Sequence, residues 1–246
     1  MIGIGNAETY DSYLSPLQYS GITVGLMHEQ MKMTGLWDGN VSAQHFFSFA
    51  FAETKNPTET AADYVGSAEY AYGIYYRFRP VRKIQFFAGL QPDVFCGILS
   101  NTRNGNNPVS MKLNANLNIS GMAAYQFRIK KQPVQLRYQV NIPVAGVLFS
   151  PEFGQSYYEI GLGEPSHLVH FASLHNQLVM RNLFSVELPF NSCTLRLGYM
   201  NWIYETQVND LNTKISTNSV YIGISKNFHT VSGRKQNKNK YKSVFE

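Results

Sequence analysis

Residues 111–130 read MKLNANLNISGMAAYQFRIK, and this stretch decides the fold. Side chains on a β-strand alternate between two faces, so residues two positions apart share a face. One face of this stretch is mostly apolar and the other mostly polar. The apolar face includes Leu113, Leu117, Ile119 and Phe127, and the polar face includes Asn114, Asn116, Asn118, Gln126 and Arg128. The alternation predicts one strand, much longer than the roughly five or six residues usual in globular proteins.

The same alternation recurs along the whole chain and predicts ten antiparallel strands. No segment has a helical period over a useful length, and no run of about 18 apolar residues predicts a transmembrane helix. Pro92 falls within one strand, where we expect a β-bulge. The predicted strands are 2–10 (the weakest), 17–34, 41–54, 63–79, 83–99, 111–130, 133–149, 172–189, 193–207 and 214–228.

The polar faces distinguish a membrane barrel from a soluble barrel with an apolar interior. Charged residues make up 15% of the chain, against roughly 25% in soluble domains. The polar faces carry Asn, Gln, Ser, Gly and isolated charges, rather than the Lys/Glu mixture of a solvated surface. Tyr and Phe gather near strand ends, as in interfacial girdles. We therefore predict an all-β fold: a single antiparallel, up-and-down transmembrane β-barrel of about ten strands.

Connection lengths predict the orientation of this barrel. Short turns alternate with longer loops, and outer-membrane barrels have short periplasmic turns and long extracellular loops. We expect the barrel to span residues 1–229. Residues 230–246 are basic, and we interpret them as a flexible periplasmic tail rather than an arm that binds nucleic acid or a membrane surface. Because no basic and apolar leader follows Met1, we expect a mature form or a fragment.

Residues 3–21, GIGNAETYDSYLSPLQYSG, resemble a motif near the start of a family of uncharacterised outer-membrane barrel proteins of Bacteroidota. In that family a glycine-rich first strand leads into an Asp-Thr/Ser-Tyr-Leu-Ser-Pro segment and then a Tyr-x-Gly strand opening. The resemblance implies location in the cell outer membrane and supplies no activity or catalytic residues. The matching residues are Asp11, Ser12, Tyr13, Leu14, Ser15, Pro16, Tyr19 and Gly21.

Charged residues on the predicted lumen face are the main candidate site. Ten strands enclose little free space, and small barrels are filled by side chains. Buried charges must be paired, so we expect a salt-bridged plug, with a narrow anion-selective path as the alternative. The candidate residues of this lumen charge network are Glu69, Arg77, Asp93, Arg128, Arg137, Arg181, Glu187 and Arg196.

Three histidines at the predicted extracellular rim are weaker candidates. His167, His170 and His175 lie in or beside the longest loop. Small outer-membrane enzymes place His, Ser and acidic residues near the rim, but these histidines lack a catalytic or zinc-binding spacing. We therefore predict no catalytic residues, no metal and no cofactor. The segment from Asp11 to Pro16 has ordinary turn chemistry, and it either folds onto the rim or binds a partner.

The sequence thus predicts a structural or adaptor subunit without catalysis. The alternatives are a small pore or transport channel and an outer-membrane enzyme acting at the rim. We expect lipid and lipopolysaccharide as partners, with other outer-membrane proteins or lipoproteins as further candidates, and no nucleic acid. Trp37 and Trp202 are predicted to be interfacial anchors.

Overall fold

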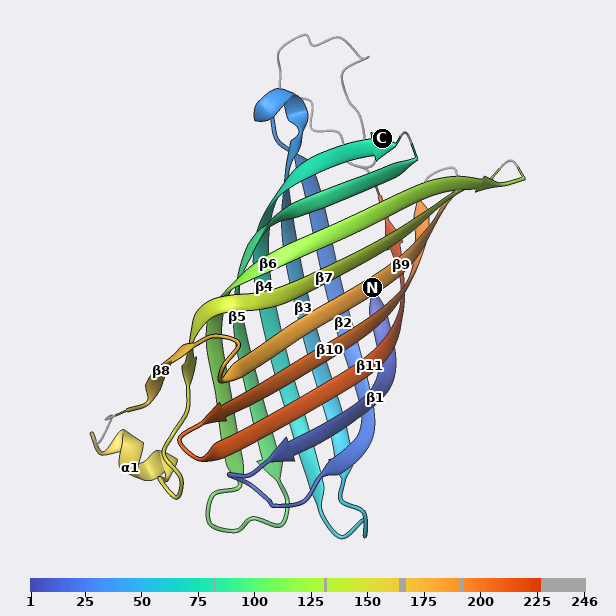
Figure 1. Ribbon diagram of the computed structural model, residues 1–246. Helices are drawn as coiled ribbons and strands as arrows, with labels where there is room; N and C mark the ends of the chain where they lie inside the picture. Colours follow the sequence, from blue (N-terminus) through green and yellow to red (C-terminus); the bar gives the residue numbers. More distant parts are fainter. Residues whose placement is uncertain (82, 131, 164–166, 191–192, 227–246) are drawn as a thin grey trace, which may run out of the picture.

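The computed structural model describes residues 1–81, 83–130, 132–163, 167–190 and 193–226. The strands follow one another around a barrel, and the predicted tail at 230–246 lies outside the described residues (Figure 1). The strands are β1 (Ile2–Asp11), β2 (Tyr19–Met33), β3 (Val41–Lys55), β4 (Ala62–Val81), β5 (Ile84–Asn101), β6 (Val109–Ile129), β7 (Gln132–Phe149), β8 (Val169–Ala172), β9 (Gln177–Pro189), β10 (Thr194–Val208) and β11 (Leu211–Ser225); the short helices are η1 (Trp37–Gly39) and α1 (Tyr157–Gly161).

Strand pairing closes the sheet into one antiparallel barrel of ten strands. Each barrel strand pairs with its neighbours in the chain, and β1 pairs with β11 from Ile2 opposite Ile222 to Asp11 opposite Thr213. Closure leaves no free sheet edge around most of the wall. The predicted fold class and strand number are confirmed. Among the described residues, no helix is long and apolar enough to cross a membrane.

The longest loop contains structure that the sequence pattern did not predict. α1 begins with a capping box in which Ser156 and Glu159 bond to each other's backbone N–H groups. β8 pairs with the outer end of β7, from Gly146 to Phe149, while β9 pairs with β7 only as far as Asn141. β8 and α1 therefore extend beyond the barrel wall at the long-loop end (Figure 1).

One predicted bulge lies elsewhere in the sheet. β5 keeps a single register with β6 through Pro92, whose side chain is exposed on the outer face. One register shift instead falls between β6 and β7, where Val144 is passed over beside Pro143, and another lies between Phe78 and Val81 at the end of the β4–β5 pair. Pro92 causes only a local gap in the ladder with β4, because proline has no N–H to donate.

The alternating faces of the strands separate the lumen from the outer wall. Asn114, Asn116 and Asn118 on β6 are buried, while Leu117 and Ile119 between them are exposed. Trp37 is exposed, but the prediction that Trp202 is an interfacial anchor is wrong. Trp202 is buried in the lumen, because it lies an even number of residues from the other inward side chains of β10.

Two isoleucines on one strand test whether the outer face contacts lipid. Ile119 and Ile129 share the outer face of β6 and are each 56% exposed. Ile119 lies six residues from the girdle residue Tyr125, or about 14 Å along the membrane normal for a strand tilted by about 45°. In a lipid-facing wall, Ile119 would lie near the midplane of the membrane and Ile129 beyond the girdle.

We predict that Ile119→Arg lowers the free energy of unfolding in lipid vesicles by about 2–4 kcal/mol, and that Ile129→Arg lowers it by at most about 1 kcal/mol. Urea titration of both variants measures the difference. Equal effects of the two substitutions would argue against a lipid-facing wall.

Candidate functional site

Three arginines and three glutamates meet in the middle of the lumen. Glu29 on β2 lies between Arg137 on β7 and Arg196 on β10 and forms an ion pair with each. The side chains of Glu29 and Arg137 are 4% and 2% exposed, so neither charge is screened by water. Arg196 also reaches Glu187, with 3.4 Å between Nε and Oε1. Since an isolated buried charge is costly, each of these groups depends on its partners.

The second ion pair joins Glu69 on β4 to Arg181 on β9. Arg181 also donates from Nη2 to Gln91 Oε1 at 2.8 Å. Its guanidinium carbon lies 3.7 Å from the centre of the Phe46 ring, which adds a cation–π contact. Charge pairing, hydrogen bonding and ring contact together fix this side chain across the lumen.

Amide side chains connect the two ionic groups. Gln44 on β3 and Gln139 on β7 exchange hydrogen bonds of 3.0 and 2.9 Å, and Gln44 also donates to Glu29. Gln91 donates to Gln44 Oε1 at 2.9 Å. The hydroxyl of Tyr75 lies 2.8 Å from that same oxygen and 2.9 Å from Ser120 Oγ. Gln44, Gln91 and Tyr75 are fully buried.

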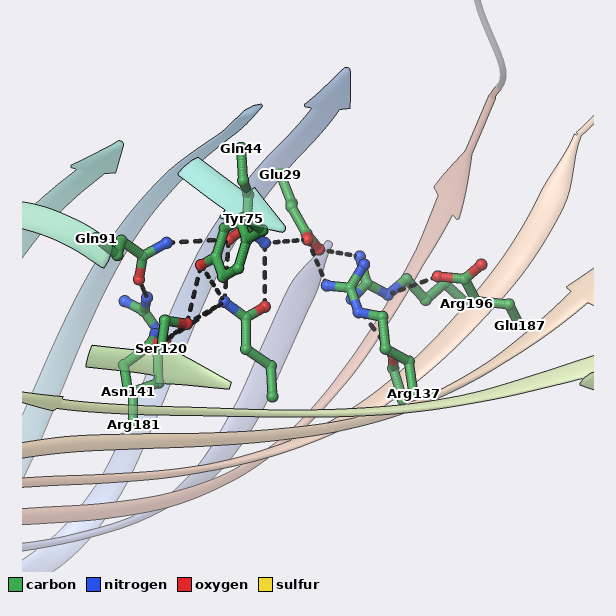
Figure 2. Close-up of polar contacts among 12 residues, drawn as sticks. Glu29, Gln44, Tyr75, Gln91, Ser120, Arg137, Asn141, Arg181, Glu187 and Arg196 are labelled. Carbon is green, nitrogen blue, oxygen red and sulfur yellow. Dashed lines mark hydrogen bonds and ion pairs between the residues drawn. The ribbon is translucent and has the colours of Figure 1, made fainter. Parts of the chain in front are cut away.

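These contacts form one continuous set, which we name the lumen network. It draws side chains from β2 to β7, β9 and β10, so eight of the ten barrel strands are tied together across the interior (Figure 2). Its members are Glu29, Gln44, Glu69, Tyr75, Gln91, Ser120, Arg137, Gln139, Arg181, Glu187 and Arg196.

Three residues predicted for the charge network lie outside this set. Asp93 is buried and accepts hydrogen bonds from Asn116, at 3.1 Å, and from Asn118. Arg77 is half-buried at the short-turn end, where it donates to the Gly39 carbonyl at 3.2 Å. Arg128 is exposed near the end of β6. The strands that carry these two arginines extend past the region in which the barrel wall encloses side chains.

Glu29 and the amide members of the network were not predicted from the sequence. Glu29 shares its face with Met27 and Met31, so the polar character of that face was not apparent. The available signal was Thr23, which lies an even number of residues from Glu29 and therefore on the same face of β2. Thr23 is buried. Gln44, Gln91 and Gln139 stood on faces predicted to be polar, but alternation alone gives no information about contacts across a lumen.

The long-loop end of the lumen is filled by an apolar group that we name the mouth cluster. Leu14, from the loop after β1, is inserted into the barrel mouth. The Phe95 ring lies 5.3 Å from Trp202 and 5.2 Å from Tyr204, measured between centroids. The mouth cluster comprises Ala7, Leu14, Ala52, Val65, Phe95, Leu99, Val179, Trp202, Tyr204 and Ile215.

The loop that carries Leu14 is tied down on both sides. Asn104 donates to the Leu14 carbonyl at 3.0 Å, and the Tyr13 hydroxyl donates to the Gln155 carbonyl at 2.9 Å. Burial, with the nearby Tyr157, Asp11 and Glu159, raises the pKa of Tyr13 to about 12, so its hydroxyl stays protonated as a donor. Of the two possibilities left by the sequence, the structure shows this segment folded onto the rim.

A buried ion pair lies beneath this loop. Lys112 Nζ is 2.9 Å from Asp11 Oδ2, and the two side chains are 6% and 0% exposed. Asp11 also accepts from the backbone N–H of Tyr13 at 3.2 Å. This pair fixes the point at which β1 ends and the loop turns into the mouth.

The whole barrel matches one family model. Residues 1–235 match the model described as "Protein of unknown function (DUF3316)". The chain belongs to the DUF3316 family. This match covers nearly the whole chain and agrees with the predicted relationship to an uncharacterised family of barrels, while the assignment to Bacteroidota stays a prediction. No curated protein matches this DUF3316 member in sequence.

Two solved structures are similar to this DUF3316 barrel. The transport unit of the autotransporter AIDA-I from Escherichia coli shares 9% identity, with a TM-score of 0.41, over 92% of this chain and 89% of that one. The translocator domain of the autotransporter NalP from Neisseria meningitidis shares 8% identity, with a TM-score of 0.35, over 89% of this chain and 86% of that one.

The three rim histidines do not come together. His175 Nδ1 lies 2.6 Å from Ser173 Oγ, two residues away. His170 Nε2 lies 3.0 Å from Asn209 Nδ2, and the carbonyl of His167 accepts from the same amide at 3.4 Å. Among the described residues of this DUF3316 chain, no group of three or more His, Cys, Asp and Glu side chains could hold a metal ion.

We predict that Glu29→Gln lowers the free energy of unfolding by about 3–5 kcal/mol, because it removes the carboxylate that pairs with both Arg137 and Arg196 and leaves an excess of buried positive charge. The matched control Glu205→Gln removes the exposed pair with Lys214 and should cost at most about 1 kcal/mol. Urea titration measures both values.

The double variant Glu29→Gln/Arg137→Gln tests whether removing a positive charge offsets the loss of the Glu29 carboxylate. Removing one of the two arginines lowers the uncompensated charge, so it should recover part of the lost stability. A double variant less stable than Glu29→Gln alone would show that packing, rather than charge balance, governs this site.

Proposed function

We propose that this chain is an integral outer-membrane β-barrel with a closed lumen, acting as a structural or adaptor subunit through contacts rather than through transport or catalysis. The lumen network carries this proposal. It crosses the barrel with three buried guanidinium groups matched by three carboxylates, of which Glu29 and Glu69 are buried and Glu187 is partly buried. A channel needs a continuous water-filled path, which these contacts oppose.

The outer wall supports the membrane assignment. Aliphatic and aromatic side chains dominate it, and a membrane wall must also satisfy its backbone groups internally, as a closed barrel does. With the short turns in the periplasm, the long loops face outward and lipopolysaccharide surrounds them. Exposed apolar residues on this wall include Ile4, Val24, Phe49, Ile74, Leu90, Ile119, Phe184 and Ile222.

One cavity in the described part of the interior has room for water but not for a large solute. A cavity of about 30 Å³ lies between the lumen network and the mouth cluster. Glu69, Thr217 and Ser219 contribute polar groups to its lining, and Phe95 and Tyr221 contribute rings. About 10–15 Å³ accommodates one water molecule, so this space suits about two waters. Hydration here would satisfy polar groups without opening a path.

A row of polar side chains on the outer wall supports a role in contacts. Asn6 on β1, Asn218 on β11, Asn201 on β10 and Asn182 on β9 are direct cross-strand partners, and we name them the asparagine ladder. Asn182 donates to Asn201 at 3.2 Å, and Asn201 donates to Asn218 at 3.0 Å. Among the described residues, the exposed Asn6 side chain has no hydrogen bond.

The position of the ladder supports a contact surface rather than an ordinary solvated edge. On β9 it is flanked by the apolar Phe184 and Met180, and on β10 by Tyr199 and Ile203. Outward polar groups within an apolar belt are costly unless a partner satisfies them. Tyr138 donates to Asn182 and Tyr199 donates to Asn218, each at 2.8 Å, so Asn6 is the member of the ladder that needs a partner. Another membrane protein with amide or hydroxyl groups fits this requirement.

The rim offers less support for an enzyme. The exposed Ser173–His175 pair joins neighbours on one turn, and no acidic side chain among the described residues bonds to His175. A serine nucleophile depends on a base that a third group orients. The observed geometry therefore favours a non-catalytic role.

Conductance in planar bilayers tests whether the lumen is closed. We predict that the native barrel passes no measurable current, whereas Tyr75→Ala produces small openings because it removes a ring from the lumen network. The control Tyr70→Ala removes an exposed ring from the outer face of the same strand and should remain silent. Steady channels from the native protein would contradict the proposal and support a pore.

Site-specific photo-crosslinking in cells tests the contact role. We predict that a crosslinker at Asn6 yields a discrete protein adduct, while one at Ile119 on β6, five strands away around the barrel, reaches lipid only. Adducts of equal yield at both positions would indicate random collision and would contradict a specific contact surface.

A further inference from the structure

The short-turn end of β4 contains an open recess that the lumen network does not use. It has a volume of about 480 Å³, and it lies where the turn before β3 meets the projecting end of β4. Arg77 donates its backbone N–H to the Asn40 carbonyl at 2.9 Å, which fixes the turn against the strand. The lining residues are Asn40, Tyr76, Arg77, Phe78, Arg79 and Pro80, which we name the rim recess.

The rim recess combines cations with aromatic rings because successive side chains of β4 point to opposite faces of the sheet. Arg77 and Arg79 share the face of the buried Tyr75, while Tyr76 and Phe78 share the outer, apolar face. β4 extends past the turn before β3, so both faces border the same space. Two guanidinium groups therefore lie beside an apolar surface at the edge of the barrel.

The rings next to the rim recess form an interfacial group. Trp37 packs edge-on against Tyr76, with centroids 5.6 Å apart, and Tyr76 packs against Phe78 at 4.7 Å. Trp37 is 70% exposed. Aromatic side chains of this kind occupy the headgroup level at membrane interfaces. This level is where a phospholipid places its phosphate.

The charge around the rim recess is strongly positive. Arg79 is exposed and has no ion pair among the described residues. The exposed Asp38 is the nearby acidic residue on the same turn, whereas Glu187 is engaged by Arg196 inside the lumen. Further exposed cations at this end of the described chain are Lys32, Lys83, Arg128 and Lys130.

We propose that the rim recess binds the phosphate of an inner-leaflet phospholipid, with Arg77 and Arg79 as phosphate ligands. Arginine presents a planar fork of donors that matches phosphate, and basic pockets at membrane surfaces bind lipid headgroups. Tyr76, Phe78 and Trp37 contact the glycerol and upper acyl region. The proposal rests on the orientation in the proposed function, which places the short turns at the inner leaflet.

Native mass spectrometry of the full chain in detergent tests this site, with phosphatidylglycerol as the probe. We expect one retained lipid, and we expect Arg79→Gln to weaken its binding at least about tenfold, as for the loss of a charge-assisted hydrogen bond. Arg79→Lys keeps the charge but not the fork, so its affinity should be intermediate. Diacylglycerol with the same acyl chains lacks phosphate and should not be retained.

Two control substitutions separate a site from general attraction. Arg103→Gln lies in a long loop at the opposite end, and Lys130→Gln lies at the same end outside the rim recess. Both should leave the affinity within about twofold. A tenfold loss in Lys130→Gln, or retention of diacylglycerol as strong as that of phosphatidylglycerol, would overturn the proposal.

Glycerol phosphate distinguishes a lipid headgroup from a free phosphate. It should fail to displace phosphatidylglycerol at equal concentration, because it lacks the apolar contacts; equal competition would overturn the lipid assignment. Failure of the native chain to insert into phosphatidylglycerol vesicles would contradict the proposed function itself. Insertion with a closed lumen but no retained lipid would reject the rim recess alone.

Discussion

Charge balance within a closed lumen is the constraint on which the structure depends. Glu29 faces both Arg137 and Arg196, and these side chains are almost completely buried. Backbone pairing closes the wall, but only matched side chains can fill the interior without leaving isolated charges. Three carboxylates and three guanidinium groups meet this requirement, and the glutamines carry the contacts from one group to the next. The lumen network therefore couples strands that share no backbone hydrogen bonds.

Alternation along the chain was sufficient to predict the barrel, its strand number and the face of most residues. It succeeded because hydrogen-bonded backbone forces a period of two wherever one side is apolar. It could not identify which side chains meet across the lumen, because these contacts depend on closure and shear rather than on local sequence. Glu29 was missed because Met27 and Met31 share its face, and Trp202 was assigned to the interface although its alternation with the neighbouring residues placed it inside.

At both ends of the barrel, local sequence determines part of the structure and long-range packing determines the rest. At the long-loop end, the Asp11–Pro16 segment has turn chemistry that a sequence reveals. Its function as a cover depends on Leu14 entering a group of rings contributed by β5 and β10. At the short-turn end, Arg77 and Arg128 have the parity of lumen residues, but the strands there extend past the region that encloses side chains. The alternation of side chains along a strand therefore predicts which of them are buried only where the barrel wall is complete.

Because the lumen is filled, the side chains that can contact other molecules lie on the outer surfaces. β1 and β11 contribute no side chain to the lumen network, yet they carry Asn6 and Asn218 of the asparagine ladder. On β4, Tyr75 belongs to the network while Arg79, four residues further on, is exposed. The proposed contact surfaces and the interior thus use different residues, so the surfaces can change without breaking the charge balance that stabilises the barrel. Such separation suits a protein whose stability comes from its interior and whose contacts come from its wall and rim.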